Sequence, residues 1–272
     1  MPELPEVQTV VNHLKNKLIG KTIISLKPIW PKVFHNFKSE EFFKINSSAK
    51  ILDVKRRAKF IIIQLKNSIL AIHLRMTGKL YFLEGKLPKH TSAEILLDNK
   101  KKLIFQDTRK FGRFYLYKNL KYINKRHGPE PLEKKFTKNI LLKILTNSKR
   151  NIKALLLDQS KIAGLGNIYV DESLWLSNIH PNSLSNLIPK KIIFKLHHSI
   201  QHILNQAISY NGTTIIDFSY VNEQSGNYSN QLNIYGKKDL ICSKCKTKIK
   251  KIKVANRGTY HCKCQKIYRN NK

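Results

Sequence analysis

The hydrophobic residues at the start of the chain follow a helical spacing. Apolar side chains recur at steps of three and four residues and would share one helix face: Val7, Val10, Val11, Leu14 and Leu18. Gly20 lies just beyond them, where glycine commonly ends a helix. Glu3 and Glu6 place acids in the first turn, where the helix dipole favours negative charge. The pattern predicts one amphipathic helix over residues 2–18.

Residues 22–118 contain short apolar runs that are separated by turn residues. The runs are rich in Ile, Leu, Phe and Val, and they cover residues 22–26, 51–54, 60–65, 69–74, 79–83, 94–97, 103–106 and 113–117. Short runs without helical segments between them are typical of antiparallel strands. Together with the first helix they predict an α+β protein whose first domain is an antiparallel β-sandwich or barrel.

The hydrophobic spacing changes after residues 126–132, which contain two prolines and a glycine. Beyond this point the spacing is helical, and four helices are predicted over residues 140–145, 152–157, 168–176 and 192–208. From residue 235 the chain is basic and bears cysteines. We therefore expect a catalytic β-sandwich domain over residues 1–127, a linker over 128–136, a helical domain over 137–234 and a zinc-finger-like β-hairpin module over 235–272.

The composition adds a strong charge to this picture. The 272 residues include 51 Lys and Arg but 17 Asp and Glu, which gives a formal net charge of +34. Such a surface attracts polyanions, with nucleic acid the commonest partner and an anionic membrane surface the competing one. An apolar fraction of 41% excludes a disordered basic tail. No apolar run is long enough to span a membrane, so we expect a cytosolic protein.

The N-terminus carries a candidate nucleophile. Removal of Met1 would leave Pro2 as a free secondary amine, and an α-amino group titrates near ~8, so that part of it is neutral at physiological pH. Attack of such an amine on a sugar C1′ gives an iminium ion, which is an electron sink. Glu3 could supply the proton for this step. The alternative is an ordinary helix start in which Pro and Glu only satisfy capping rules.

Five segments carry distinctive motifs: Met-Pro-Glu-Leu-Pro-Glu-Val at 1–7, Lys-Arg-Arg-Ala-Lys-Phe at 55–60, Asp-Thr-Arg-Lys-Phe-Gly at 107–112 together with Met76, Gly-Leu-Gly-Asn-Ile-Tyr at 164–169, and the cysteines of 242–264. Together they resemble formamidopyrimidine-DNA glycosylase, a bacterial enzyme family that removes oxidised purines such as 8-oxoguanine. The resemblance spans the whole chain.

The resemblance implies the catalytic residues. Pro2 corresponds to the Schiff-base nucleophile of the family, and Glu3 to the acid that assists base loss and ring opening. Lys59 corresponds to an active-site lysine that donates a proton in β-elimination and binds the phosphates of the lesion, although a basic cluster alone is more typical of a solvated face. Arg257 corresponds to the finger arginine that grips the flanking phosphates and assists δ-elimination.

The resemblance also implies residues that open the duplex. A glycosylase must take its target nucleotide out of the base stack, and side chains must fill the space that is left. Met76 and Phe111 would wedge between bases, and Arg109 would bond the orphaned cytosine. His90 corresponds to a histidine that contacts DNA. On periodicity alone, Met76 and Phe111 would be core residues.

The helical domain resembles the family's helix-two-turn-helix, which binds the DNA backbone. A helix N-terminus with amide and cationic side chains can hold a phosphate without reading sequence. The expected DNA ligands are Lys149, Arg150, Lys153 and Asn167. The Gly-x-Gly of residues 164–166 is not a dinucleotide fingerprint, because no strand precedes it and the third glycine is absent.

The four cysteines predict one structural zinc ion. Cys242-x2-Cys245 and Cys262-x-Cys264 flank a predicted hairpin, and four thiolates suit tetrahedral zinc. The second pair departs from the family pattern, which is Cys-x2-Cys. Three possibilities follow: the shortened pair binds zinc, His261 replaces Cys262, or the metal is absent.

The sequence therefore predicts a bifunctional DNA glycosylase and apurinic/apyrimidinic (AP) lyase of base excision repair that acts on oxidised purines in damaged double-stranded DNA. It would work as a monomer in the bacterial cytoplasm, at the nucleoid, without a membrane or a redox or nucleotide cofactor. Residues 211–231 resemble the family's lid over the extruded base. Two alternatives stay open: an endonuclease VIII-like glycosylase for oxidised pyrimidines, and a non-catalytic zinc-ribbon DNA-binding protein.

Overall fold

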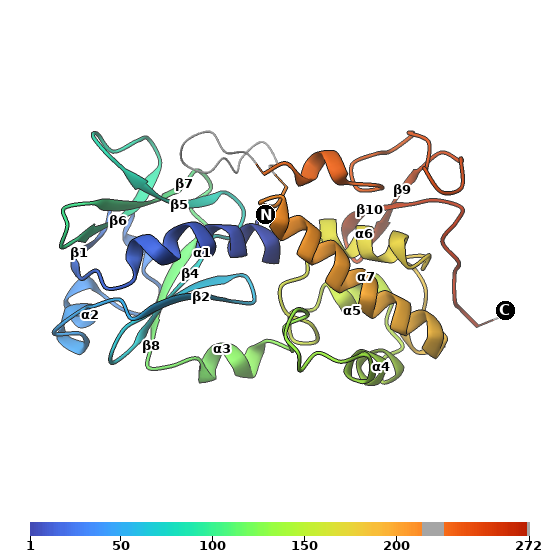
Figure 1. The fold of residues 1–272 in the computed structure, drawn as a ribbon, viewed down its shortest axis with the longest axis horizontal. Coiled ribbons are helices and arrows are strands. Elements are labelled where there is room, and N and C mark those ends of the chain that lie inside the picture. The colour runs from blue at the N-terminus through green and yellow to red at the C-terminus, as the bar shows by residue number, and fades with distance from the viewer. Residues whose placement is uncertain (214–225, 271–272) are drawn as a thin grey trace. The chain divides into compact units, whose positions relative to one another are not determined.

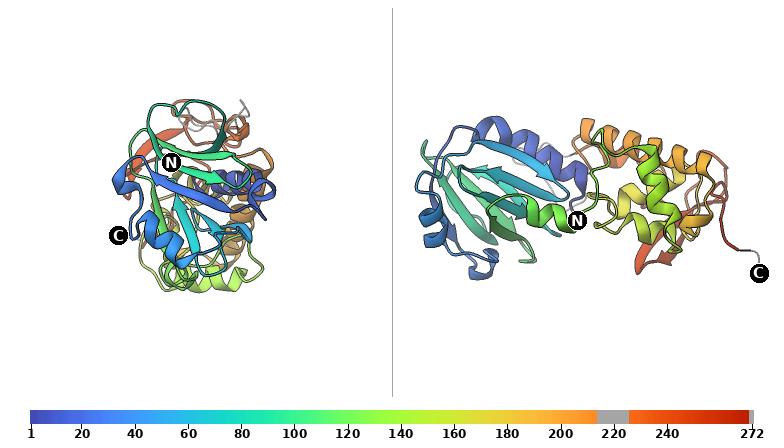
Figure 2. Two further views of the ribbon diagram at one scale, coloured as in Figure 1. Left: turned by 90° about the vertical axis from the view of Figure 1, so that its left-hand side faces the viewer. Right: turned by 90° about the horizontal axis from the view of Figure 1, so that it is seen from below.

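The computed structural model describes residues 1–213 and 226–270, and the chain divides into two compact units (Figures 1 and 2). The first unit consists of Met1–Lys125 with Tyr210–Asn227, and the second of Arg126–Ser209 with Tyr228–Lys272. Each unit has its own apolar interior. The predicted α+β class is confirmed, with antiparallel sheets in the first unit and mainly helices in the second.

The described residues of the first unit form two four-stranded antiparallel sheets (Figure 1). One has the order β1-β6-β7-β5 and the other β2-β3-β4-β8. The strands are β1 (Ile23–Pro28), β2 (Asp53–Arg57), β3 (Phe60–Gln64), β4 (Ile69–His73), β5 (Gly78–Leu83), β6 (Thr91–Leu97), β7 (Lys102–Asp107) and β8 (Arg113–Tyr117). Each of the eight predicted apolar runs overlaps one of these strands, and the sandwich prediction is confirmed.

Helix α1 (Leu4–Leu18) packs along β2 and β3 and contributes to the core between the sheets. Its predicted apolar stripe is buried, from Val7 to Leu18. The helix begins at Leu4 rather than Pro2, because Glu3 is extended, with φ −103° and ψ −170°. This extended start places Pro2 ahead of the helix instead of within its first turn.

Two short helices of the first unit were missing from the sequence prediction: α2 (Ser39–Ile45) and α3 (Lys121–Arg126). Each has seven residues or fewer, which is too short for a helical period to stand out clearly. Helix α3 places Ile123 against Ile62, Ile69 and Ala71 on the face of β3 and β4 that is turned away from the main core. Both faces of these strands are therefore buried, which explains why β3 is an unbroken apolar run instead of an alternating one.

The described part of the second unit contains four α-helices and a hairpin. The helices are α4 (Lys138–Thr146), α5 (Ile152–Leu156), α6 (Asn167–Leu176) and α7 (Lys190–Ser209), and the hairpin consists of β9 (Lys250–Val254) and β10 (Arg257–His261). All four predicted helices are present. Helix α6 packs on α7 and β10 and is buried along most of its length, so it forms the centre of this unit. Among the described residues, no helix is long and apolar enough to cross a membrane.

Candidate functional site

The N-terminal segment is fixed by hydrogen bonds to the first turn of α1. Pro2 is buried, and Glu3 is 2% exposed. The backbone N–H of Glu3 donates to Oε2 of Glu6 at 2.8 Å, and its carbonyl accepts from Val7 at 3.1 Å. These bonds fix the backbone of Glu3, the residue that follows the predicted nucleophile Pro2.

Glu6 is a site residue that the sequence prediction treated only as a favourable charge at a helix start. Its side chain is 3% exposed. Oε1 accepts from the N–H of Thr213 at 2.9 Å and from its hydroxyl at 3.1 Å, while Oε2 accepts from Glu3. A Cβ on Gly212 would approach Oε1 to 2.8 Å. Glu6 therefore ties the N-terminal segment to residues 212–213, and no sequence signal pointed to that partner.

Lys59 lies in the tight turn between β2 and β3 and is 6% exposed. The preceding residue, Ala58, has a left-handed φ of +53°, which the turn requires. Arg56 braces the turn, since it donates to the carbonyl of Ala58 at 2.9 Å and to Oε1 of Gln8 at 3.0 Å. Gln8 belongs to α1, so this bond fixes the hairpin end that carries Lys59 beside the N-terminal half of α1.

Asp107 organises the loop that carries Arg109 and Phe111. Its side chain is fully buried. Oδ2 accepts from the N–H of Gly112 at 2.7 Å, and Oδ1 accepts from the N–H of Arg109 at 3.2 Å and from the hydroxyl of Thr77. Thr77 follows Met76 in the loop between β4 and β5. One carboxylate therefore holds both loops that carry the predicted duplex-opening residues.

The structure brings Met1, Met76 and Phe111 to one pocket of the first unit. The pocket has a volume of about 410 Å³ and is also lined by basic side chains, Arg75 and Arg113. Phe111 is 48% exposed, so it is not a core residue, and Met76 is half-buried. The guanidinium of Arg109 lies 4.8 Å from the centre of the Phe111 ring. Apolar and cationic side chains thus gather beside Met1.

His90 lies in the same region of the first unit. It is exposed, has a left-handed φ of +67°, and its carbonyl accepts from the N–H of Asp107 at 3.0 Å. The bond connects the loop before β6 to the residue that organises the Arg109 loop. The exposed His90 is thereby joined through its backbone to Asp107.

Lys153 is buried within the second unit, and its expected role as a phosphate ligand stays a prediction. Its side chain is fully buried, and Nζ donates to Oδ1 of Asp171 at 2.6 Å and to the carbonyl of Gly258 at 3.3 Å. In this arrangement the ammonium is engaged within the protein. Burial raises the pKa of Asp171 to about 6, although Lys153 opposes this effect.

The pair holds the β9–β10 hairpin on the helices of the second unit. The other carboxylate oxygen of Asp171 accepts from the N–H of Tyr260 at 3.1 Å, and the carbonyl of Gly258 also accepts from Nδ2 of Asn167 at 3.0 Å. Arg257 precedes Gly258 at the start of β10 and is exposed. Its backbone position is therefore fixed by buried polar groups while its guanidinium faces solvent.

Asn167, a predicted DNA ligand, lies at the N-terminus of a helix. It is the first residue of α6 and is only partly buried. Its Oδ1 is buried and has no hydrogen-bond partner among the described residues, while the amide nitrogen is used by Gly258. A helix N-terminus favours an anion, and an unsatisfied polar atom beside it marks a place where a ligand or water completes the bonding.

Lys149 and Arg150 lie in the turn before α5, and both are exposed. Nη1 of Arg150 donates to Oδ2 of Asp158 at 2.7 Å. Burial of the Asp158 carboxyl works against its ionisation. The hydrogen bonds from Arg150 and Ser160 outweigh the effect of burial and lower the pKa of Asp158. Arg150 is therefore partly engaged within the unit, whereas Lys149 projects into solvent.

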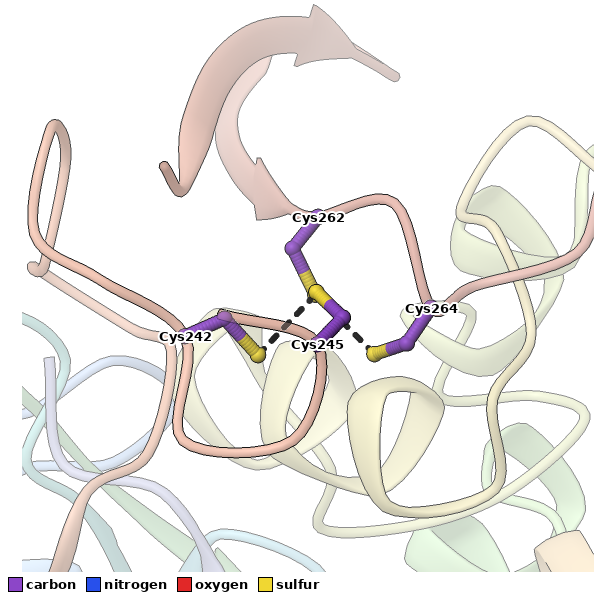
Figure 3. A group of neighbouring side chains, drawn as sticks. All are labelled: Cys242, Cys245, Cys262 and Cys264. Carbon is purple, nitrogen blue, oxygen red and sulfur yellow. Dashed lines mark hydrogen bonds between the residues drawn. The ribbon is translucent and has the colours of Figure 1, made fainter. Parts of the chain in front are cut away.

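The four cysteines gather into one cluster, as Figure 3 shows. Cys242 and Cys245 precede β9, and Cys262 and Cys264 follow β10. All four Sγ atoms lie within 4.8 Å of one another, and the shortened pair brings Cys262 and Cys264 to 3.1 Å. Zinc at about 2.3 Å from each sulfur needs separations of about 3.8 Å, so small adjustments would complete a tetrahedron.

The cysteine cluster is typical of a metal site and contains no disulfide among the described residues. The cysteines are free thiols, and Cys242 accepts from Nε1 of Trp175 at 3.4 Å, the kind of outer bond that orients a metal-bound thiolate. His261 packs its ring against His180, with ring centres 4.5 Å apart. The four cysteines, not a set with His261, could therefore hold the zinc ion, which supports the first of the three possibilities.

The predicted lid over residues 211–231 falls largely on residues 214–225, which lie outside the described residues. Its two ends are described. Thr213 bonds Glu6, and the N–H of Asn227 donates to the carbonyl of Tyr210 at 3.0 Å.

Comparison with known proteins extends the similarity beyond motifs. Two family models match the chain: the formamidopyrimidine-DNA glycosylase N-terminal domain over residues 1–114 and the formamidopyrimidine-DNA glycosylase H2TH domain over residues 127–219. The formamidopyrimidine-DNA glycosylase of Pelotomaculum thermopropionicum is 42% identical across 98% of this chain and 100% of its own length. That of Chloroflexus aurantiacus is 40% identical across 96% of both chains.

Solved structures agree over the same extent. A complex between a mutant of Lactococcus lactis Fpg and DNA containing Fapy-dG matches with a TM-score of 0.90 and 38% identity, covering 97% of this chain and 99% of that one. The Lactococcus lactis formamidopyrimidine-DNA glycosylase bound non-covalently to DNA with an AP site matches with a TM-score of 0.87 and 37% identity, covering 97% and 99%.

Proposed function

Since the chain belongs to the formamidopyrimidine-DNA glycosylase family, we propose that it excises 8-oxoguanine and formamidopyrimidines from damaged double-stranded DNA. It is a DNA glycosylase of base excision repair with AP lyase activity. The observation that carries the proposal is the rigid N-terminal segment, bonded through Glu6 and opening into the pocket of Met76 and Phe111. The endonuclease VIII-like and non-catalytic alternatives are not favoured by the comparisons.

The reaction begins at the nitrogen of Pro2 after Met1 is removed. This amine attacks C1′ of the extruded nucleotide, the bond from C1′ to the base breaks, and the damaged base leaves with a proton. Glu3 supplies a proton to the sugar ring oxygen, which opens the ring and leaves an iminium ion at C1′. Its buried position beside Pro2 suits a group that must exchange protons at one fixed atom.

Strand cleavage follows from the acidity that the iminium gives to the 2′ hydrogen. Loss of this proton breaks the C3′–O bond, and a second elimination breaks the C5′–O bond. Water then hydrolyses the remaining imine and frees Pro2. In this scheme Lys59 donates a proton in β-elimination and binds the phosphates of the lesion. Arg257 clamps a flanking phosphate from the β9–β10 hairpin and assists δ-elimination. The permanently charged Arg257 is a phosphate clamp rather than a proton donor.

The remaining DNA contacts are assigned by exposure. Met76, Arg109 and Phe111 occupy the space left by the extruded nucleotide, and His90 contacts the same strand region. Lys149, Arg150 and Asn167 bind backbone phosphates. Lys153 donates to the carbonyl of Gly258 and so helps to hold the neighbouring Arg257 in place. The zinc ion stabilises the hairpin that carries Arg257 when it is bound. Because the relatives are bacterial, we place the protein at the nucleoid in the bacterial cytoplasm, acting as a monomer.

The test is borohydride trapping on a duplex with 8-oxoguanine opposite cytosine. The full chain should give a covalent protein–DNA adduct and strand scission, and Pro2→Gly should give neither while still binding DNA. Glu3→Gln is the matched control, because it keeps the amine. It should lose base excision but still form an adduct with DNA that already has an AP site.

Three outcomes would contradict the scheme. An adduct that persists in Pro2→Gly would show that another amine is the nucleophile. Full activity in protein that retains Met1 would do the same. Faster release of an oxidised pyrimidine than of 8-oxoguanine would move the enzyme to the endonuclease VIII-like class.

A further inference from the structure

A second basic region lies on the first unit, away from the N-terminal segment. It is a groove of about 1190 Å³ between the C-terminal half of α1 and the strands β5 and β7. Six lysines line it, against one glutamate, Glu84: Lys17, Lys21, Lys79, Lys100, Lys101 and Lys102. We use the name lysine groove for this set. None of the residues assigned to base excision or duplex opening belongs to it.

The lysine groove is separated from the reaction centre along α1. Pro2 precedes the first residue of this helix, Leu4, whereas Lys17 lies in its last turn. At about 1.5 Å per residue, some 13 residues place Lys17 about 20 Å from the helix start. The groove therefore cannot be part of the pocket that contains Met1, Met76 and Phe111.

Several lysines of the groove are not neutralised within the described part of the chain. Among the described residues, Lys21, Lys100 and Lys101 form no ion pair, and the contact of Lys102 with Glu94 is 3.5 Å long, with the lysine 40% exposed. Lys17 lies 3.1 Å from the ring of His13, and burial together with Lys17 lowers the pKa of that histidine. The charge of Lys17 therefore opposes protonation of His13, although burial is the larger cause of the lowered pKa.

The groove also has the framework that a bound strand needs. Lys100 and Lys101 lie in the turn between β6 and β7, which Asn99 braces through a bond from the N–H of Lys101 at 3.2 Å. Tyr81 and Phe82 of β5 provide partly buried aromatic surface, and Lys17 lies 6.0 Å from the ring of Phe82. Basic grooves with aromatic surfaces track the backbone of nucleic acids without reading sequence.

We infer that the lysine groove is a second DNA-binding surface, which holds the phosphate backbone of a DNA segment other than the one in the reaction centre. Charge complementarity identifies the occupant as a polyanion, and the aromatic surface favours DNA over a flexible acidic peptide. Binding there would keep the protein on undamaged DNA while the reaction centre is empty or occupied. The inference extends the proposed function. It rests on that function only for the statement that the reaction centre binds damaged DNA.

The test compares two triple variants with equal changes in net charge. Lys17→Gln, Lys100→Gln and Lys101→Gln remove exposed lysines of the groove. Three exposed lysines of the same unit that do not line it serve as the control: Lys27→Gln, Lys44→Gln and Lys66→Gln. Affinity for an undamaged duplex is measured against salt. The slope of log K against log salt should fall by about 0.9 for each phosphate that is no longer neutralised, or by roughly 2 to 3 in the groove variant.

A second measurement isolates the groove from the reaction centre. The protein is saturated with a short duplex that contains a stable abasic-site analogue, and a labelled undamaged duplex is then added. The unmodified chain and the control variant should bind the second duplex, and the groove variant should not. All three proteins should cleave a short lesion duplex at the same rate, since no residue of the reaction centre is altered.

The outcomes separate the two proposals. Equal salt slopes in the groove and control variants would overturn the second site, as would an equal loss of affinity for poly-glutamate, which would make the groove a general anion surface. Absence of lesion cleavage by the unmodified chain would instead refute the proposed function, and the salt slopes would still decide the role of the groove.

Discussion

Asp107 offers the sharpest test of how the fold presents the duplex-opening residues. Its buried carboxylate accepts from Gly112, Arg109 and Thr77, so it holds the loops of Phe111 and Met76 together. Asp107→Asn changes few atoms but replaces one accepting oxygen by an NH2 group. At least one of the three donors must then face another donor.

The magnitude follows from the number of bonds affected. A hydrogen bond to a charged group contributes about 1.5–3 kcal/mol, and a buried donor left without a partner costs about 1–3 kcal/mol. The bond from Gly112 is the shorter of the two backbone bonds, at 2.7 Å against 3.2 Å for Arg109. The amide should keep its oxygen toward Gly112, and the loss at Arg109 and Thr77 should lower the free energy of unfolding by about 2–4 kcal/mol.

Urea unfolding measures the first consequence, and cleavage of paired lesions measures the second. The denaturation midpoint should fall without a change in slope, since a local loss of bonds exposes no new surface on unfolding. Base excision opposite cytosine should slow relative to excision opposite other bases, because the N–H of Arg109 keeps only its bond to the hydroxyl of Thr77 at 3.1 Å. An already abasic duplex should be cleaved at nearly the original rate, because within the described residues the bonds of the Asp107 carboxylate go to Gly112, Arg109 and Thr77.

Asp98→Asn is the matched control. It makes the same replacement in the same unit, but Asp98 is exposed and accepts from the N–H of Thr22 at 3.0 Å. This change should shift the unfolding free energy by less than about 1 kcal/mol. If Asp107→Asn matched this control in stability and kept its preference for the opposite base, the role assigned to the carboxylate would be refuted.

Three further predictions concern the second unit. Cys264→Ser should reduce bound zinc well below one equivalent by elemental analysis and weaken DNA binding, whereas undiminished zinc would exclude this cysteine as a ligand. Lys153→Met leaves a buried carboxylate without its partner and should lower the unfolding free energy by about 3–5 kcal/mol, so an unchanged urea midpoint would contradict the buried pair. The pKa of Asp158 lies below its ordinary 3.8, so its bond with Arg150 stabilises the fold above about that pH and is lost as the pH falls through the lowered value. Arg150→Gln should therefore cost less than about 1 kcal/mol near neutral pH and progressively less as the pH falls below 3.8, with urea midpoints at neutral and acid pH as the measure.

The elements of the fold were largely accessible from the order of residues, because apolar spacing and turn residues act within a few positions of each other. All eight strands of the two sheets were anticipated in this way, together with α1 and α4 to α7. The two short helices of the first unit were missed because seven residues or fewer complete less than two turns. The unbroken apolar run of β3 was found, but its cause, the cover supplied by Ile123 of α3, was not.

Some side-chain roles could be predicted from the sequence, and others required the folded structure. Cys242, Cys245, Cys262 and Cys264 could be recognised as a ligand set from residue type and spacing, but the shortened pair left His261 open until its ring was found against His180. Glu6 looked like a charge at a helix start because its partner, Thr213, is more than two hundred residues away. Its buried bonds needed the folded chain.

The N-terminal motif, the charge and the strand pattern could thus be predicted from the sequence, since each depends on neighbouring residues or on composition. The burial of polar side chains could not be predicted in this way. Lys153 resembles a solvent-facing cation in its helix, yet folding brings Asp171 to 2.6 Å and removes both groups from water. The loop of Arg109 likewise takes its shape from Asp107 and Thr77, which lie on different strand ends. Such pairings depend on which distant surfaces pack together, and that is a property of the tertiary structure alone.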